Sequence, residues 1–146
     1  LRAQLKKMAL TNVVFTGRFP ASDMPLLLSA ASVLLVNLKP APIFSYTIPN
    51  KLQAYLAAGR PIIAALDGEG ARILEEAGAG LSCPAGDYVA IAAAIRQLYS
   101  ADPAEIERMS IGARTYFETN FSLSLLTSRL NSSFSSAVAA KNRVRD

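Results

Sequence analysis

Strand-like apolar runs alternate with amphipathic helical runs along this chain, and that alternation limits the possible folds more than any other feature. The runs expected as strands are residues 12–16, 33–38, 61–66 and 80–83. Helical patterns lie between and after them, at residues 22–31, 50–58, 71–77, 87–99, 103–118 and 122–140. Repeated strand-helix-strand units of this kind form a parallel sheet with helices on both faces. We therefore predict one α/β domain over residues 1–146.

Local signals set the expected element boundaries. Ser22 is expected to cap the first of these helices, and Gly59 to end the helix over residues 50–58 in the left-handed conformation. Residues 33–38 are apolar on both faces, which predicts a strand covered by helices on each side. Residues 67–70 are expected to form a turn, because they hold two glycines among acids.

Two features of the composition exclude whole classes of chemistry. The chain has no histidine, so histidine-dependent catalytic relays and histidine-ligated metals are excluded within it. Its one cysteine, Cys83, cannot form an internal disulfide or a cysteine zinc site. We expect Cys83 to be a small apolar residue at a strand end, in a reducing, cytoplasmic setting. No metal site is expected in this chain.

The charge pattern argues against nucleic acid as a partner. The 15 basic and 11 acidic residues give a net charge of +4, and the bases gather only near the two ends. These terminal bases are Arg2, Lys6, Lys7, Lys141, Arg143 and Arg145. Neither end has the basic face interleaved with aromatics that nucleic-acid binding needs. A weak attraction to anionic lipid headgroups fits the same charges, which would place the protein peripherally on the inner face of the cell membrane. The apolar runs are too broken to span a bilayer, and no signal peptide is expected.

Three loops are expected to share the edge of the sheet at which the parallel strands end. These loops are residues 17–20, 39–51 and 67–70. In open parallel sheets the ligand binds at this edge, where loops lead into helix N-termini. The helix after Pro49 directs its free amide groups toward it, which suits a phosphate. Thr47 and Asn50 add neutral donors and Lys51 adds a positive charge.

The sequence around this helix resembles the donor-site helix and following strand of family 4 glycosyltransferases. The resemblance runs over residues 47–63, TIPNKLQAYLAAGRPII. Further segments match in order: a strand that ends at Gly17, the EEAGAG run, the Pro-x-Gly-Asp turn at residues 84–87, and the closing pattern at residues 116–122. The similarity is strongest to the branch that builds bacterial capsules and lipopolysaccharide O-antigens.

The resemblance implies part of a larger enzyme. Members of this family have two Rossmann-like domains in the GT-B arrangement, and this chain resembles most of the second, donor-binding domain. It starts at Leu1 within a helical pattern, so we expect a fragment, inactive alone, that lacks the N-terminal acceptor domain. Transfer of a sugar from a UDP sugar, with retention, to a lipid-linked or saccharide acceptor is implied, and no cofactor. A fragment of this sheet exposes an edge that is open to pairing with a second copy.

The resemblance also suggests which residues contact the donor. It adds Ile48, Pro49, Gln53, Arg18 and Phe19 to the polar residues already named. From its place in the loop over residues 67–70, Glu69 is a further candidate for a donor contact. Ordinary helix capping is the alternative for Thr47, Ile48 and Asn50, and a packed turn is the alternative for Arg18 and Phe19. An exposed acid is the alternative for Glu69, and a solvated surface lysine for Lys51. No catalytic residue is assigned.

One departure from the family affects the ribose contact. Many members carry two glutamates eight positions apart, of which the second binds the ribose; Tyr46 and Ala54 occupy these positions here. Gln53 is the neighbouring polar residue, although it points about 100° away from position 54 on a helix.

Two alternative functions fit the sequence less well. A nucleotide-sugar 2-epimerase shares the two-domain architecture but depends on carboxylates and histidine at the donor site, and the chain has no histidine. A non-enzymatic signalling receiver needs an acidic pair after its first strand and a phosphate-accepting aspartate later. Gly17-Arg18 and Asn37-Leu38-Lys39 stand at those strand ends instead.

Overall fold

A three-stranded parallel sheet forms the centre of the molecule. The computed structural model describes residues 1–143, so Arg145 lies outside the described residues. Strands β1 (Leu34–Asn37), β2 (Ile62–Ala65) and β3 (Gly80–Cys83) are hydrogen-bonded in the order β1-β2-β3. Leu34 lies opposite Ile62, which in turn lies opposite Gly80. The predicted α/β class with a parallel sheet is confirmed.

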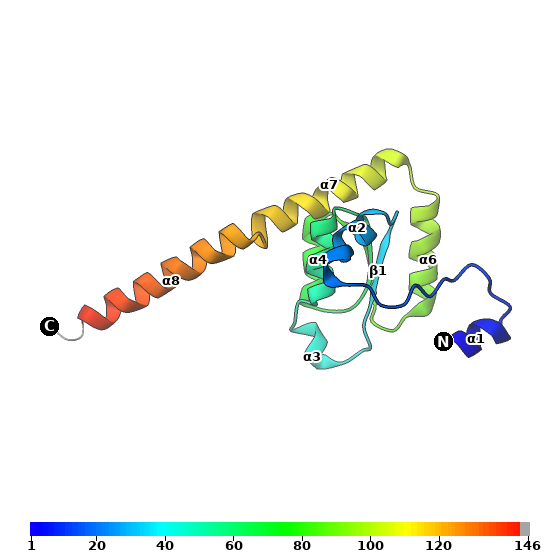
Figure 1. The fold of residues 1–146 in the computed structure, drawn as a ribbon, viewed down its shortest axis with the longest axis horizontal. Coiled ribbons are helices and arrows are strands. Elements are labelled where there is room, and N and C mark those ends of the chain that lie inside the picture. The colour runs from blue at the N-terminus through cyan, green and yellow to red at the C-terminus, as the bar shows by residue number, and fades with distance from the viewer. Residues whose placement is uncertain (144–146) are drawn as a thin grey trace.

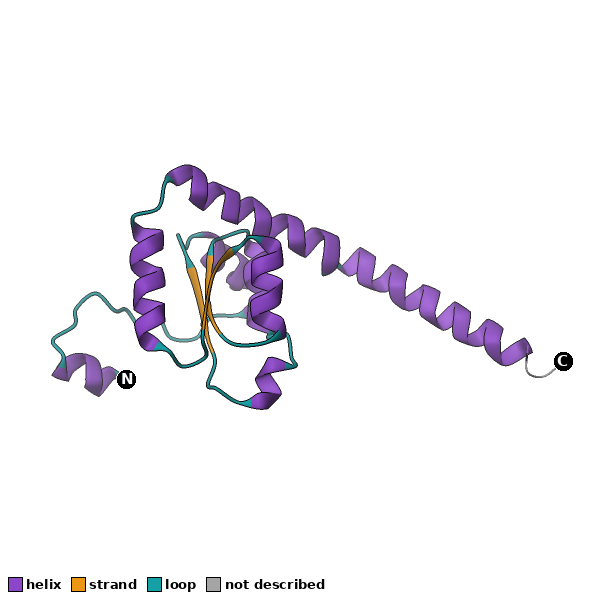
Figure 2. Cartoon of the chain, turned by 180° about the vertical axis from the view of Figure 1, so that it is seen from behind, coloured by secondary structure: helices purple, strands orange, loops and turns teal. Residues whose placement is uncertain are grey.

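Helices cover both faces of this sheet. Figure 2 shows the strands between helices on two sides, with a longer helix running across one end. The helices, with one 3-10 turn called η1, are α1 (Arg2–Lys7), η1 (Ala21–Asp23), α2 (Met24–Ser29), α3 (Pro42–Ser45), α4 (Asn50–Ala58), α5 (Glu69–Ala77), α6 (Tyr88–Tyr99), α7 (Pro103–Asn120) and α8 (Leu123–Arg143). In Figure 1, α8 extends away from the body of the molecule.

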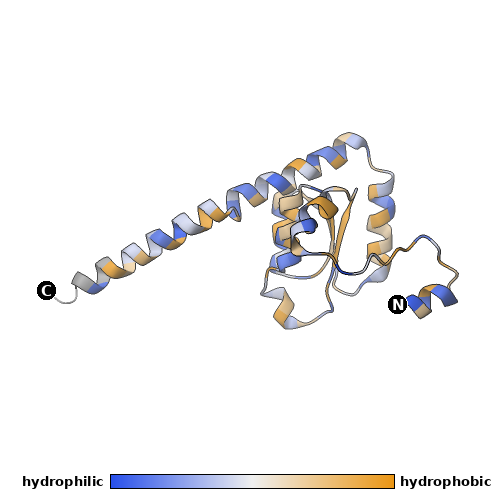
Figure 3. Ribbon diagram, viewed as in Figure 1, coloured by the Kyte–Doolittle hydropathy of each residue, from blue (hydrophilic) through white to orange (hydrophobic). Residues whose placement is uncertain are grey.

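The core consists of two apolar layers, one on each side of the sheet. The larger layer joins the sheet to α4, α5 and α7 and includes Leu52, Leu56 and Ile73. The smaller layer lies under α6 and includes Ile63, Cys83 and the half-buried Ile106 and Met109 of α7. Figure 3 shows the strands as predominantly hydrophobic, whereas α8 mixes hydrophobic and hydrophilic residues along its length. Burying β2 from both sides explains why all four of its residues are apolar.

The strand predicted at residues 12–16 is wrong. These residues follow an irregular extended path and are all exposed, and Val14 keeps 80% of its surface accessible. A strand requires a hydrogen-bonded neighbour, and no described segment lies beside this one as a partner. The guanidinium of Arg2 lies over the Phe15 ring of this segment, 4.4 Å from the ring centre.

Three other expectations need correction. Ser22 lies within η1 and bonds Asp23, so it does not cap the following helix, which ends two residues early at Ser29. Leu35 of β1 is 47% exposed, so this strand is covered on one face only. The expected turn at residues 67–70 is shorter, because α5 already starts at Glu69.

The sequence predicts a loop over residues 39–51, but α3 lies within it, because Pro42 suits the first turn of a helix. Most other elements agree with the sequence. Helix α4 covers residues 50–58 and ends at Gly59, which has the left-handed φ of 63°. Asp87 caps α6 by accepting hydrogen bonds from the amides of Val89 and Ala90. Cys83 is buried at the end of β3, as expected. Among the described residues, no helix has an apolar stretch of the length that a bilayer crossing requires.

Candidate functional site

Two of the three predicted loops meet at the carboxyl end of the sheet. The loop after β1 and the loop after β2 approach each other so closely that Gly68 admits no side chain. A Cβ atom on Gly68 would lie 2.1 Å from the carbonyl oxygen of Ser45, and its φ of +73° also favours glycine. The carboxylate of Asp67 accepts a hydrogen bond of 3.1 Å from the amide of Ala85, which ties in the loop after β3.

This close approach places the N-termini of α4 and α5 side by side. Gly70, in the first turn of α5, lies against Pro49, the residue that precedes α4; a Cβ on Gly70 would be 3.5 Å from Pro49 Cδ. The N-terminus of a helix carries a partial positive charge and unpaired amide donors. Two adjacent N-termini make this edge of the sheet suitable for an anion with more than one phosphate.

The first turn of α4 is open to a ligand. Pro49 provides no side-chain cap, and its carbonyl accepts hydrogen bonds from the amides of Leu52 and Gln53. No side chain caps α4, so ordinary helix capping does not explain the residues at its start. Asn50 and Lys51 are exposed, and no acid lies in this turn. An incoming phosphate would meet amide groups and a lysine ammonium group.

The other predicted residues near α4 have different surroundings. The hydroxyl of Thr47 donates to the carbonyl of Ile43 at 3.3 Å, so it closes the short helix before it. Ile48 is half-buried and packs against the larger core layer, and Gln53 is half-buried. Ala54, at the position of the family's ribose-binding glutamate, is exposed and lines a shallow hollow with α2.

Glu69 lies in the first turn of α5 and is paired with Arg72. Its Oε2 accepts a hydrogen bond of 2.9 Å from Arg72 Nε, and its Oε1 accepts a second one from Arg72 Nη2. These bonds from Arg72 lower the pKa of the Glu69 carboxyl below its ordinary value. Glu69 is therefore an ionised group that can only accept hydrogen bonds at neutral pH.

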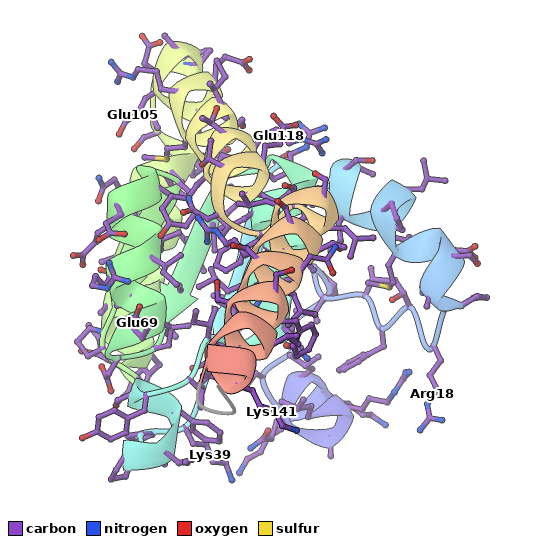
Figure 4. The ribbon with its side chains drawn as sticks, turned by 90° about the vertical axis from the view of Figure 1, so that its left-hand side faces the viewer. Arg18, Lys39, Glu69, Glu105, Glu118 and Lys141 are labelled. Atoms are coloured by element: carbon purple, nitrogen blue, oxygen red, sulfur yellow. The ribbon has the colours of Figure 1, made fainter. Side chains whose placement is uncertain are left out.

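Arg18 and Phe19 are not brought to this edge. Both are exposed, and no hydrogen bond among the described residues joins residues 17–20 to either of the two loops. In Figure 4, Arg18 projects into open space far from Glu69, which lies at the lower end of its helix. The segment that carries Arg18 has no strand partner to fix its place, so its role in a site stays a prediction.

Neither Arg72 nor Tyr116 is among the site residues predicted from the sequence. Arg72 also bonds Glu76, whose Oε2 accepts a hydrogen bond of 3.1 Å from the Tyr116 hydroxyl. The spacing of Glu69, Arg72 and Glu76 along one helix face is a signal for ion pairs that could have been used. No local signal points to Tyr116, because it lies 40 residues from its partner.

Two further observations limit what the described residues do. No group of three or more His, Cys, Asp and Glu side chains within residues 1–143 is arranged to hold a metal ion. An apolar groove of about 440 Å³ lies at the opposite end of the sheet, between β1, α6 and α7, and includes Leu35, Ile95 and Tyr99. The described residues that line it carry no charge, so it offers no cationic group to a phosphate.

Comparison with known proteins identifies related sequences and folds. A family model described as "Glycosyl transferases group 1" matches residues 1–101. The chain is 32% identical over 112 residues to the Probable glycosyltransferase WbjE of Pseudomonas aeruginosa, a match that covers 74% of this chain and 26% of that protein.

Solved structures share the fold. Anabaena Alr3699/HepE in complex with UDP-glucose superposes with a TM-score of 0.76 at 23% identity, covering 92% of this chain and 35% of that one. The sucrose-phosphate synthase of Thermosynechococcus elongatus superposes with a TM-score of 0.81 at 22% identity, covering 95% of this chain and 34% of that one. This chain thus spans about a quarter of the length of the curated relative and about a third of these solved chains.

Proposed function

The chain belongs to the group 1 glycosyltransferases, and from this premise we propose that it is the donor-binding part of an enzyme that transfers a sugar from a UDP sugar. The observation that carries the proposal is the pair of adjacent helix N-termini, where Pro49 meets Gly70. They lie at the carboxyl end of a parallel sheet, where Rossmann-like folds bind nucleotides. The choice of UDP is supported by the solved structures of Anabaena Alr3699/HepE with UDP-glucose and with UDP.

The donor diphosphate is proposed to bind at the first turn of α4. The amides of Asn50 and Lys51 face it, and the Lys51 ammonium group neutralises charge on the diphosphate as the bond to the sugar breaks. Thr47, Ile48, Pro49 and Gln53 are proposed to line this binding site. Arg18 and Phe19 would join it only if their segment moved toward the loops. The proposed site uses neither a metal ion nor a cofactor.

The whole enzyme is proposed to need more than this chain. A further domain binds a lipid-linked or saccharide acceptor, the sugar is transferred with retention, and the chain alone is inactive. The product is proposed to be a cell-surface polysaccharide, either a capsule or an O-antigen. The similarity to WbjE supports this proposal through the shared family. A lipid-linked acceptor would place the enzyme in the cytoplasm, on the inner face of the membrane. The family assignment favours this function over an epimerase or a signalling module.

A nucleotide titration of the 146-residue chain, followed by backbone amide NMR, tests the binding site. We expect UDP, and not GDP or ADP, to shift the amides of Asn50, Lys51, Glu69 and Gly70. Lys51→Met should weaken UDP binding about tenfold, because one charge-assisted contact is lost. Lys6→Met, which removes an exposed lysine from α1, is the matched control and should leave UDP binding unchanged.

Two results would count against the proposal. Shifts confined to the groove around Leu35 and Tyr99 would move the site to the opposite end of the sheet. No shift with any nucleotide in a folded chain calls for the same titration on the longer protein, and a negative result there would reject UDP-sugar binding.

A further inference from the structure

A network of four side chains connects the proposed donor site to helix α7. Arg72 lies between two carboxylates of its own helix, Glu69 one turn before it and Glu76 one turn after it. The Tyr116 hydroxyl of α7 donates to Glu76 from the other side. Arg72 is thus held by a carboxylate on each side. Its hydrogen bonds to these carboxylates raise the pKa of Arg72. Burial, and next the hydrogen bond to Glu76, raise the pKa of Tyr116.

The position of Glu69 is unusual for an anion site. A carboxylate in the first turn of α5 is favoured by the helix dipole but repels a diphosphate bound beside it. Arg72 reduces this repulsion, because its guanidinium contacts both oxygens of the carboxylate. Each oxygen still has a lone pair free for another donor. The other acid of this loop, Asp67, already accepts a bond from Ala85.

We propose that Arg72 is a positioning residue that presents the Glu69 carboxylate to hydroxyl groups of the bound nucleotide sugar. An ionised carboxylate accepts hydrogen bonds and cannot donate them, so its partner must be a donor such as a sugar hydroxyl. The first turn of α4 contains no acid, whereas Glu69 precedes Gly70, the residue of α5 that lies against Pro49. This inference rests on the proposed function and names the part of the ligand that Glu69 recognises.

The hydroxyl groups that Glu69 binds can belong to the ribose or to the transferred sugar. Titration with three ligands distinguishes these two possibilities. The 146-residue chain and its variants are titrated with UDP, UDP-glucose and 2′,3′-dideoxy-UDP, again by amide NMR. If Glu69 binds the transferred sugar, Glu69→Gln weakens UDP-glucose binding about tenfold and leaves UDP unchanged. If it binds the ribose, UDP and UDP-glucose weaken alike, while 2′,3′-dideoxy-UDP binds the variant as well as the wild type.

Variants of Arg72 test whether it acts through Glu69. Arg72→Met leaves the charge of Glu69 uncompensated, so it should weaken all three ligands. In the double variant this repulsion is absent, and binding should be no weaker than in Glu69→Gln alone. Arg72→Lys, which keeps the charge but not the two-pronged contact, should be intermediate. Glu75→Gln is the control, since Glu75 lies on the same helix but accepts from Ser82 at 2.8 Å. The amide spectrum shows for each variant that the fold is kept.

The outcomes separate this inference from the proposed function. Unchanged binding in Glu69→Gln, or an equal loss for all three ligands, overturns the inference and leaves UDP binding in place. Additive losses in the double variant overturn the positioning role of Arg72. Failure of the wild-type chain and of the longer protein to bind UDP rejects the proposed function, and this inference with it.

Discussion

Residues 12–16 and β3 show opposite relations between sequence and structure. The first segment, Asn-Val-Val-Phe-Thr, has the β-branched and aromatic composition of a strand but is irregular and exposed. The second, Gly-Leu-Ser-Cys, contains residues that are poor strand formers, yet it pairs with β2 along its whole length. A strand is thus determined here by the presence of a neighbouring strand more than by composition.

The same contrast separates the body of the molecule from its periphery. Leu52 and Leu56 of α4 are fully buried in the larger core layer, whereas η1, α2 and the residues before them are exposed or half-exposed. Apolar residues before β1 contribute little to the core, because the sheet ends at β1 and offers them no surface to cover. Stability should therefore reside in residues 33–121.

The largest expected effect comes from the pairing of β3. A Cβ on Gly80 would lie 1.8 Å from the carbonyl oxygen of Ile62, which is fixed in the middle strand. Gly80→Ala should lower the free energy of unfolding by about 4 kcal/mol or more, measured by urea denaturation. Gly78→Ala is the control: its Cβ meets nothing within 4 Å, and only its φ of +55° is unfavourable, at about 1 kcal/mol. Equal costs would show that β3 does not pair in this register.

Truncations of apolar side chains compare the body with the periphery directly. Leu52→Ala should cost about 3 kcal/mol of unfolding free energy, because it leaves a cavity under α4. Val14→Ala, in the segment with strand-like composition, should change it by less than about 0.5 kcal/mol. A cost for Val14→Ala close to that for Leu52→Ala would mean that residues 12–16 are packed in solution.

A smaller effect concerns the reactivity of Cys83. Burial at the end of β3, and next the charge of Asp87, raise the pKa of its thiol, so less thiolate is present at any given pH. Alkylation of Cys83 at pH 8 should be at least about tenfold slower than that of a cysteine placed at Val14 in a Cys83→Ser chain, followed by mass spectrometry. Similar rates in the two chains would show that the end of β3 opens readily.

The raised pKa of Cys83 also predicts a weak dependence of stability on pH. The unfolded chain releases the thiol proton at lower pH than the folded chain does. The contribution of Cys83 to stability is therefore complete below the ordinary thiol pKa and is lost as the pH rises through the folded value. The difference in unfolding free energy between the wild type and Cys83→Ser should shrink over that range.

Much of the fold and part of the site followed from local sequence. Gly59 marked a helix end that the structure confirms, since a left-handed residue acts within one turn, whereas the side-chain cap by Asp87 was not predicted. The open first turn of α4, with Lys51, followed from Pro49 and the expected parallel sheet. Ser22 did not cap α2, because η1 occupies that position, and Leu35 is open because it lines the groove between β1, α6 and α7.

By itself, the sequence determined the α/β class, the order of β1, β2 and β3 along the chain, and the family, because these depend on periodicity and on short motifs. Only the tertiary structure decided that Pro49 lies against Gly70, that Tyr116 contacts Glu76, and that residues 12–16 have no partner. Each of these depends on how segments distant in sequence pack together, and the periodicity of any one segment carries no information about its neighbour.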